Sequence, residues 1–210
     1  MIYLILLLSL SLRLFGLNQS LWLDEAAQAF ESARPLSQQL QIQADFWPPL
    51  YHILLHFWMM GGKSEVWLRL LSVGISVVSV YLLYKLVKHW LSEKTALLTT
   101  LFLALSPFHI WYSQEVRPYT LTIFWALLTT IFLLRRQYLL YVFAAVGFLY
   151  TTYLAPFMLV SQGVYLLFWD KDYLRKWLLS LTVAALAFFP WLPSLLDQLQ
   201  GGMRLATILP

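Results

Sequence analysis

Residues 66–87 read VWLRLLSVGISVVSVYLLYKLV, an apolar run long enough to cross a lipid bilayer as one helix. The chain is 60% hydrophobic and only 11% charged over its 210 residues, whereas a soluble domain usually carries about 25% charged residues. A soluble fold with so few charges would not cover its surface. The composition therefore predicts an all-α, polytopic transmembrane helical bundle.

Six further apolar stretches flank this run. Met1–Leu17 lacks the basic n-region and the small-x-small cleavage site of a signal peptide, so we interpret it as a retained span. Together the stretches predict about seven spans, the others being Thr95–Tyr112, Tyr119–Leu134, Tyr138–Tyr153, Pro156–Trp169 and Trp177–Leu196. The last residues do not resemble the end of a finished domain. We expect residues 1–210 to be a single transmembrane module and an N-terminal fragment of a longer protein.

The first two spans are separated by a long connection, residues 18–65, which we expect to be the first external loop. Its first part, Asp24–Arg34, is amphipathic and ends before Pro35, as a helix would. Its second part, Phe46–Met60, is apolar but too short for a span and opens with two prolines. The loop is therefore predicted to carry two juxtamembrane helices.

The basic residues predict the orientation of the chain. With a cytoplasmic N-terminus, eight of the fourteen basic residues fall in three short inside loops, as the positive-inside rule requires. These are Lys85, Lys88, Lys94, Arg135, Arg136, Lys171, Arg175 and Lys176. The pattern indicates a multi-pass protein of the cell membrane with residues 18–65 on the extracytoplasmic side, and no nucleic-acid partner. The absence of cysteine excludes disulfides and thiolate metal sites.

The first polar motif is Leu21-Trp22-Leu23-Asp24-Glu25. Asp24 stands where a helix N-cap would, and acids suit a helix N-terminus. A carboxylate near a bilayer surface also suits a general base that accepts a proton from an attacking hydroxyl. Adjacent acids are, in addition, ligands for a divalent cation. The motif alone leaves these readings open.

The second polar motif is Gln114-Glu115-Val116-Arg117-Pro118-Tyr119, just outside the third span. The planar fork of Arg117 suits a phosphate group, with Glu115 orienting the arginine or assisting a metal. The alternative is an interfacial cap, in which Arg117 reaches lipid headgroups. Both motifs fall on the same predicted side of the membrane.

Other polar residues lie near the same boundary. Arg13 and Arg69 either extend to the interface or face a cavity and bind an anionic substrate. His52 and His56 are spaced i, i+4 on one helix face, as in metal sites, but no carboxylate stands at a clear third position. We favour interfacial roles for this pair, and His109 is equally ambiguous.

In order and spacing these motifs resemble the GT-C glycosyltransferases. Within that superfamily they look like the dolichyl-phosphate-mannose protein mannosyltransferase family with its bacterial relatives, including the aminoarabinose transferases of lipid A. The resemblance covers roughly residues 5–195 and rests on four segments, Leu21–Glu25, Asp45–Tyr51, Glu65–Arg69 and Ser113–Tyr119. His52 departs from the pattern, since an aromatic residue is common there.

The resemblance implies an inverting sugar transfer from a polyprenyl-phosphate donor to a lipid, glycan or protein acceptor at the outer face. By that likeness Asp24 is the base, with Glu25 beside it in the catalytic motif, and Arg117 faces the departing phosphate. The other substrate-binding candidates are Glu115, Tyr119, Arg69, Arg13, Asp45 and Tyr51. A divalent metal ion is a candidate cofactor, with Glu25, Glu115, His52 and His56 as weak ligand candidates.

Two other functions fit the same pattern. A flippase for lipid-linked sugars would share the cavity and the phosphate-binding arginine but would need no base, so Asp24→Asn should harm it little. A non-catalytic membrane subunit is the second alternative.

Overall fold

The computed structural model describes residues 1–40, 42 and 46–208, with side chains up to residue 200. Every regular element in these ranges is helical, which confirms the predicted all-α class. The elements are α1 (Ile2–Leu14), α2 (Leu23–Ala33), η1 (Leu36–Gln38), α3 (Leu50–Trp58), α4 (Glu65–Trp90), α5 (Glu93–Leu105), α6 (Pro107–Ser113), α7 (Tyr119–Leu134), α8 (Tyr138–Leu149), α9 (Ala155–Trp169), α10 (Lys171–Phe188), η2 (Phe189–Trp191) and α11 (Leu192–Ile208).

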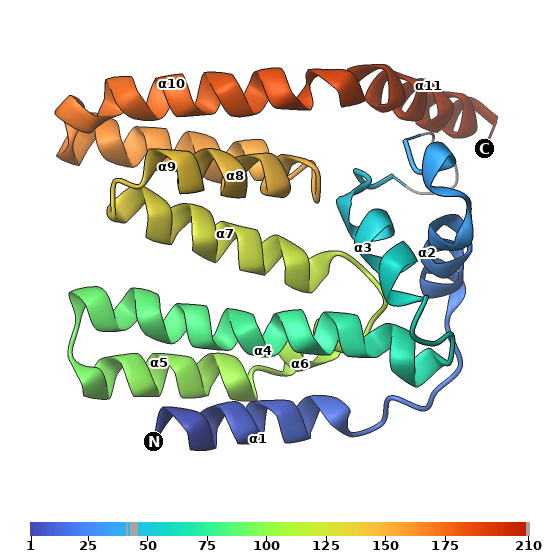
Figure 1. Ribbon diagram of the computed structural model, residues 1–210, viewed down its shortest axis with the longest axis horizontal. Coiled ribbons are helices and arrows are strands. Elements are labelled where there is room, and N and C mark those ends of the chain that lie inside the picture. The colour runs from blue at the N-terminus through green and yellow to red at the C-terminus, as the bar shows by residue number, and fades with distance from the viewer. Residues whose placement is uncertain (41, 43–45, 209–210) are drawn as a thin grey trace.

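The long helices lie side by side, and α2 and α3 lie together across one end of them (Figure 1). Helix α4 is central, because it packs against α1 and α5 on one side and against α7 on the other. Helix α8 continues the bundle between α7 and α10, and α9 contacts all three. The end covered by α2 and α3 is the end at which both polar motifs lie.

Two helical segments are long and apolar enough to cross a membrane, Glu65–Trp90 and Lys171–Gln200. A third is counted if α5 and α6, which are bent by 58° relative to each other, form one broken span. Four shorter apolar helices, α1, α7, α8 and α9, occupy the other predicted spans. The membrane-type bundle is therefore supported, and the number of seven spans stays a prediction.

Within the predicted span Thr95–Tyr112 the helix breaks at Ser106, and α5 and α6 together are long and apolar enough for one bent span. The Ser106 hydroxyl accepts a hydrogen bond from the His109 backbone N–H at 3.4 Å and so caps a new helix. Pro107 is the first residue of that helix, a position that tolerates proline because its missing N–H would be unpaired there anyway.

Close contacts between glycine and tryptophan join the later helices. A Cβ added at Gly147 of α8 would meet the Trp125 ring of α7 at 2.5 Å, so the absence of a side chain lets the two helices approach. Gly163 of α9 faces the Trp177 ring of α10 in the same way. Both tryptophans are buried, and their rings fill the space that the glycines leave.

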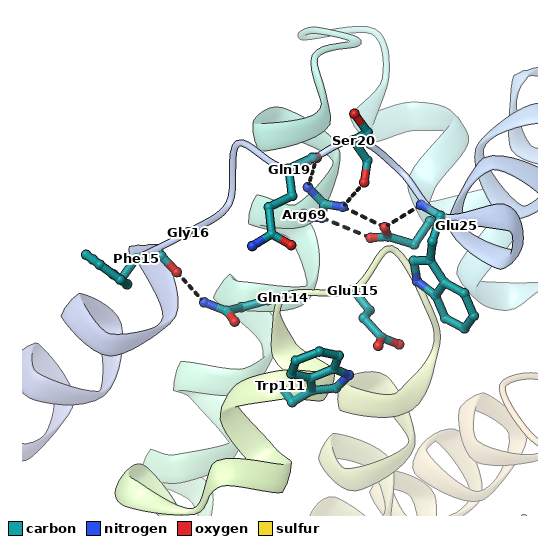
Figure 2. Close-up of a pocket in the computed structure, with 10 residues that line it drawn as sticks. Phe15, Gly16, Gln19, Ser20, Glu25, Arg69, Trp111, Gln114 and Glu115 are labelled. Carbon is teal, nitrogen blue, oxygen red and sulfur yellow. Dashed lines mark hydrogen bonds and ion pairs between the residues drawn. The ribbon is translucent and has the colours of Figure 1, made fainter.

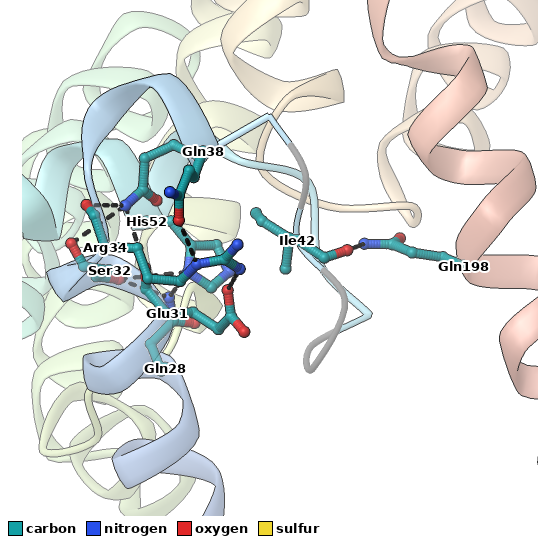
Figure 3. Close-up of polar contacts among 9 residues, drawn as sticks. Gln28, Glu31, Ser32, Arg34, Gln38, Ile42, His52 and Gln198 are labelled. Atoms are coloured by element: carbon teal, nitrogen blue, oxygen red, sulfur yellow. Dashed lines mark hydrogen bonds and ion pairs between the residues drawn. The ribbon is translucent and has the colours of Figure 1, made fainter.

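The connection between α1 and α4 folds into the two predicted short helices, although its side of the membrane stays a prediction. Polar contacts hold α2 against α3. Gln28 Nε2 donates to His52 Nδ1 at 2.7 Å (Figure 3), and His56 Nδ1 donates to the Ser32 carbonyl at 2.8 Å. Helix α11 contacts the same connection from the other side: Gln198 Nε2 donates a hydrogen bond to the Ile42 carbonyl at 3.3 Å.

A pair of stacked tryptophans closes the turn between α3 and α4. The Trp58 and Trp67 rings lie 4.8 Å apart between centroids. Each indole N–H donates to the other residue's carbonyl, at 2.7 and 2.9 Å. This paired contact fixes the start of α4, and with it the position of Arg69.

The basic residues that predicted the orientation gather at the opposite end of the bundle. They lie where α4, α7 and α9 end and where α5, α8 and α10 begin, away from α2 and α3 (Figure 1). Two of them are paired with acids, Lys88 with Glu93 and Arg136 with Asp170.

Candidate active site at one end of the helical bundle

A buried ion pair joins the first polar motif to α4. Arg69 Nε and Nη2 donate to the two carboxylate oxygens of Glu25 at 2.9 and 2.6 Å, the two-bond geometry that arginine makes with carboxylates. Glu25 is fully buried, and Arg69 is 5% exposed. The pair anchors the start of α2 against the core.

Arg69 also fixes the chain between α1 and α2. Its remaining N–H groups donate to the carbonyls of Gln19 at 2.5 Å and Ser20 at 3.2 Å (Figure 2), and to the Leu17 carbonyl at 2.8 Å. All five guanidinium donors are therefore used inside the protein. The prediction that Arg69 binds substrate directly is not supported, since an anion would have to displace one of these acceptors. The alternative that Arg69 extends to the interface is wrong.

Glu25 joins the two polar motifs to each other. Its Oε1 also accepts the backbone N–H of Val116 at 2.9 Å, and its Oε2 accepts the backbone N–H of Trp22 at 3.3 Å. With Arg69, four donors surround this one carboxylate. Such a carboxylate is poorly suited to accept a proton or to hold a metal, so the arrangement favours a positioning role over the predicted catalytic or metal-binding one.

Asp24 is placed differently from its neighbour. The N-cap of α2 is Trp22, and Asp24 is the second residue of the helix, so the alternative of Asp24 as the N-cap is wrong. Its side chain is half-buried, and no described residue donates a hydrogen bond to its carboxylate. Of the two acids of the motif, Asp24 is therefore the one available for chemistry.

Arg117 reaches Asp24 from the second motif. Its Nη1 donates to the Asp24 carbonyl at 3.2 Å, and its guanidinium lies over the Trp47 ring at 5.7 Å. Trp47 in turn makes an edge contact with Tyr119 at 5.7 Å between centroids. The predicted residues Asp24, Arg117 and Tyr119 are thus brought together, and Trp47, which we did not single out, joins them.

Glu115 lines a pocket of about 520 Å³ beside this cluster, together with Trp22, Arg69, Trp111 and Gln114 (Figure 2). Burial raises the pKa of the Glu115 carboxyl, and the nearby charges of Glu25 and Asp24 also raise it, against a hydrogen bond from Trp111 and the charge of Arg117. Its Oε2 is buried, and no described residue hydrogen-bonds it. Glu115 is therefore a carboxyl group that faces a cavity and whose pKa is raised chiefly by burial.

Tyr51 supports the cluster from beneath. Its side chain is fully buried, its hydroxyl lies 2.7 Å from Ser72 Oγ, and Ser72 donates to the Arg117 carbonyl at 3.4 Å. The Leu50 backbone N–H donates to the Tyr150 carbonyl at 2.9 Å. Through Ser72, Tyr51 supports the Arg117 backbone. This geometry does not favour the predicted contact of Tyr51 with substrate.

Arg13 lies inside the bundle, away from the interface. It is fully buried, its Nε donates to Ser76 Oγ at 2.7 Å, and its Nη2 lies 2.6 Å from His109 Nδ1. Interior partners on α1, α4, α5 and α6 account for its hydrogen bonds, so the interfacial alternative is wrong and direct substrate binding is not favoured. His109 takes its place as the partner of Arg13.

The described residues contain no group of three or more His, Asp or Glu side chains that could hold a metal ion. His52 and His56 instead use Nδ1 in contacts with α2. Burial and the charge of Arg117 lower the pKa of His52 to about 3. Asp45 lies outside the described residues. A divalent metal stays a prediction, and the histidine pair has a structural explanation.

The structure adds four residues to the site that the sequence analysis did not propose as site residues: Trp47, Ser72, Trp111 and Gln114. Trp47 stands inside the Asp45–Tyr51 segment, and Gln114 and Trp111 stand in or before the second motif, so closeness to the motifs was an available signal. Gln114 Nε2 donates to the carbonyls of Phe15 at 2.6 Å and Arg13 at 3.2 Å, contacts that no local pattern encodes.

Comparison with known proteins extends the argument beyond geometry. A family model described as dolichyl-phosphate-mannose-protein mannosyltransferase matches residues 47–196. The matched stretch contains Arg69, Glu115 and Arg117, and Asp24 and Glu25 lie before it. No curated protein matches the chain. The match covers most of the chain and agrees with the helical, membrane-type fold, and it confirms the resemblance predicted from the motifs. The chain therefore belongs to the dolichyl-phosphate-mannose-protein mannosyltransferase family, whose members are membrane glycosyltransferases of the GT-C type.

Proposed function

We propose that this protein transfers a sugar from a polyprenyl-phosphate donor to an acceptor hydroxyl at the extracytoplasmic face of the cell membrane, with inversion at the anomeric carbon. Family membership implies a lipid-linked sugar donor, and the proposal adds the carrier, the face and the stereochemistry. The observation that carries it is the Glu25 carboxylate, which holds the Asp24 and Arg117 motifs together across 91 residues of sequence.

In the proposed reaction Asp24 takes the proton of the acceptor hydroxyl as the hydroxyl oxygen attacks the anomeric carbon. The bond between that carbon and the phosphate oxygen breaks, and its electron pair leaves with polyprenyl phosphate. Negative charge grows on the phosphate, so a fixed cation beside it lowers the barrier. Arg117 is that cation, because its guanidinium lies against Asp24 and is oriented by Trp47.

Glu115 has a separate part in this proposal. A protonated carboxyl donates a hydrogen bond, and the raised pKa of Glu115 and its place in the pocket lining support this role. We assign it to a phosphate oxygen or a sugar hydroxyl of the donor. Glu25 and Arg69 hold this arrangement in place and make no contact with the reacting atoms.

The test is sugar transfer from radiolabelled polyprenyl-phosphate mannose, glucose and aminoarabinose by membranes that carry the protein, wild type against Asp24→Asn. General-base catalysis contributes about 10²–10⁴-fold, so the variant should lose at least 100-fold of the transfer rate at equal expression. Asp197→Asn is the matched control, since Asp197 is an exposed acid on α11 and its loss should leave transfer unchanged. Equal transfer by wild type and Asp24→Asn would remove Asp24 as the base, and no transfer by either would count against a transferase.

A further inference from the structure

A second pocket lies at the end of the bundle away from the candidate active site. It has a volume of about 450 Å³ and lies between α4, α7 and α9, within the range of small-molecule sites, about 300–1,000 Å³. Its lining is largely apolar and includes Leu86, Trp90, Leu133, Met158 and Tyr165. Arg69 and Leu86 are 17 residues apart on α4, which is roughly 25 Å along a helix. The pocket is therefore distinct from the site around Asp24.

Two basic side chains stand at the edge of this pocket. Lys85 and Arg135 line a small hollow that shares Leu86, Trp90 and Leu134 with the pocket. Both are exposed, and within the described residues neither forms an ion pair. Two neighbouring basic residues are neutralised by acids: Lys88 pairs with Glu93 at 2.5 Å, and Arg136 pairs with Asp170 at 2.6 Å. The pocket edge thus presents two cations that the fold itself does not neutralise.

The polar floor of the pocket is already satisfied from within. Gln162 donates to Thr129 Oγ1 at 3.1 Å and to Thr130 Oγ1 at 3.3 Å, and it accepts from the Tyr141 hydroxyl at 2.8 Å. Ser161 donates to the Met158 carbonyl at 2.7 Å. A ligand in the pocket would therefore find apolar surface and few open polar groups, as an alkyl chain requires.

We propose that this pocket binds an anionic glycerophospholipid, with one acyl chain between α4, α7 and α9 and the phosphate between Lys85 and Arg135. The pairing of an apolar pocket with two unneutralised cations at its edge matches the two parts of such a lipid. Basic groups between helices on the cytoplasmic side bind anionic headgroups, and the charge pattern predicts that this end faces the cytoplasm.

The experiment measures lipid retention by the purified full chain in detergent, by native mass spectrometry. Phosphatidylglycerol and phosphatidylcholine with identical acyl chains are the probes. The wild type should retain phosphatidylglycerol in clear excess. Each basic residue near an anionic lipid contributes about 1 kcal/mol, or roughly fivefold, so Lys85→Gln/Arg135→Gln should lower phosphatidylglycerol retention by about tenfold or more and leave phosphatidylcholine nearly unchanged.

Two further variants separate the parts of the proposal. Lys171→Gln/Arg175→Gln removes two exposed basic residues of the same end that do not line the pocket, and it should behave as wild type. Ser161→Phe places a ring in the pocket and should lower retention of both lipids while their ratio is kept. Equal retention of the two lipids by wild type, or an equal loss in both double variants, would overturn the proposal. Retention of polyprenyl phosphate that falls in Lys85→Gln/Arg135→Gln as much as retention of phosphatidylglycerol does would overturn it as well, by assigning the pocket to the donor. None of these outcomes depends on transferase activity.

Discussion

Adjacent acids in one motif have different environments here. Glu25 is surrounded by donors from Arg69, Val116 and Trp22, whereas no described residue donates a hydrogen bond to the carboxylate of Asp24, one residue earlier. The sequence places both acids in the catalytic motif but does not separate them, because the partners of Glu25 lie 44 and 91 residues away. Only the contacts that Glu25 makes with Arg69 and with the Val116 N–H decide which acid is held and which is open.

The buried Glu25–Arg69 ion pair allows a prediction about the free energy of unfolding. Removing one partner of a buried ion pair leaves an unpaired charge and costs about 3–5 kcal/mol. We expect Glu25→Gln and Arg69→Gln each to lower the free energy of unfolding in detergent by about that amount, and the double variant to lose less than the sum. Additive losses would contradict a direct pair. Asp24→Asn serves as the control, with little expected effect on stability, since its side chain makes no hydrogen bond to a described residue.

The lowered pKa of His52 allows a prediction about how the stability of the protein depends on pH. Its pKa in the folded protein is lowered to about 3 from an ordinary value of 6.5 by burial and by the charge of Arg117. The stability that depends on neutral His52 is therefore fully present above pH 6.5 and is lost as pH falls toward 3, which amounts to about 2 kcal/mol at pH 5. Unfolding curves at pH 7 and pH 5 should show this loss in wild type and a smaller one in His52→Gln. Identical losses would assign the acid sensitivity to other groups.

At the scale of the helices, the predicted helix boundaries agree with the structure where proline or capping residues mark them. Helix α7 begins at Tyr119 directly after Pro118, and α9 begins within one residue of the predicted start at Pro156. Residues 95–112 are less regular than their composition suggests. The apolar stretch continues through Ser106 and Pro107, where the cap and the proline divide it into α5 and α6, bent by 58° relative to each other.

The contact between α7 and α8 predicts that two glycine-to-alanine substitutions have opposite effects on the free energy of unfolding. At Gly147 a methyl group would meet the buried Trp125 ring at 2.5 Å, whereas at Gly74 nothing lies within 4 Å of an added Cβ. Overpacking costs about 1–3 kcal/mol, so Gly147→Ala should lower the free energy of unfolding by that amount. Gly74→Ala should raise it by about 0.5–1 kcal/mol, since alanine favours a helix interior. A neutral Gly147→Ala would show that Trp125 moves aside freely.

For the whole molecule, the sequence predicted the helical class, the family and the gathering of polar motifs at one end. Periodicity and composition report local burial, so they identified α4 and α7 well. They do not report which distant groups meet, which is why the interior position of Arg13, the saturation of Arg69 and the role of Trp47 were missed. The number of spans and the orientation remain predictions, since helix lengths alone single out two or three spans.

The orientation has a direct test, because the chain has no cysteine. Ser37 lies in η1 at the end with the candidate site, and Lys171 begins α10 at the opposite end; both are exposed. Ser37→Cys should react with a membrane-impermeant maleimide in intact cells, whereas Lys171→Cys should react only after permeabilisation. The reverse pattern would place the candidate site in the cytoplasm and would contradict the proposed extracytoplasmic reaction.

The bond from the Val116 N–H to Glu25 has a consequence for the order of synthesis. Chains emerge from the ribosome N-terminal end first, so Asp24 is made long before Arg117. The Val116 N–H can reach Glu25 only after α3 to α6 have been synthesised, and the hydrogen bonds from Ser194 and Gln198 to residues 40 and 42 can form only later. Until residues 116 and 117 have been synthesised and placed, a nascent chain therefore lacks the proposed reaction centre.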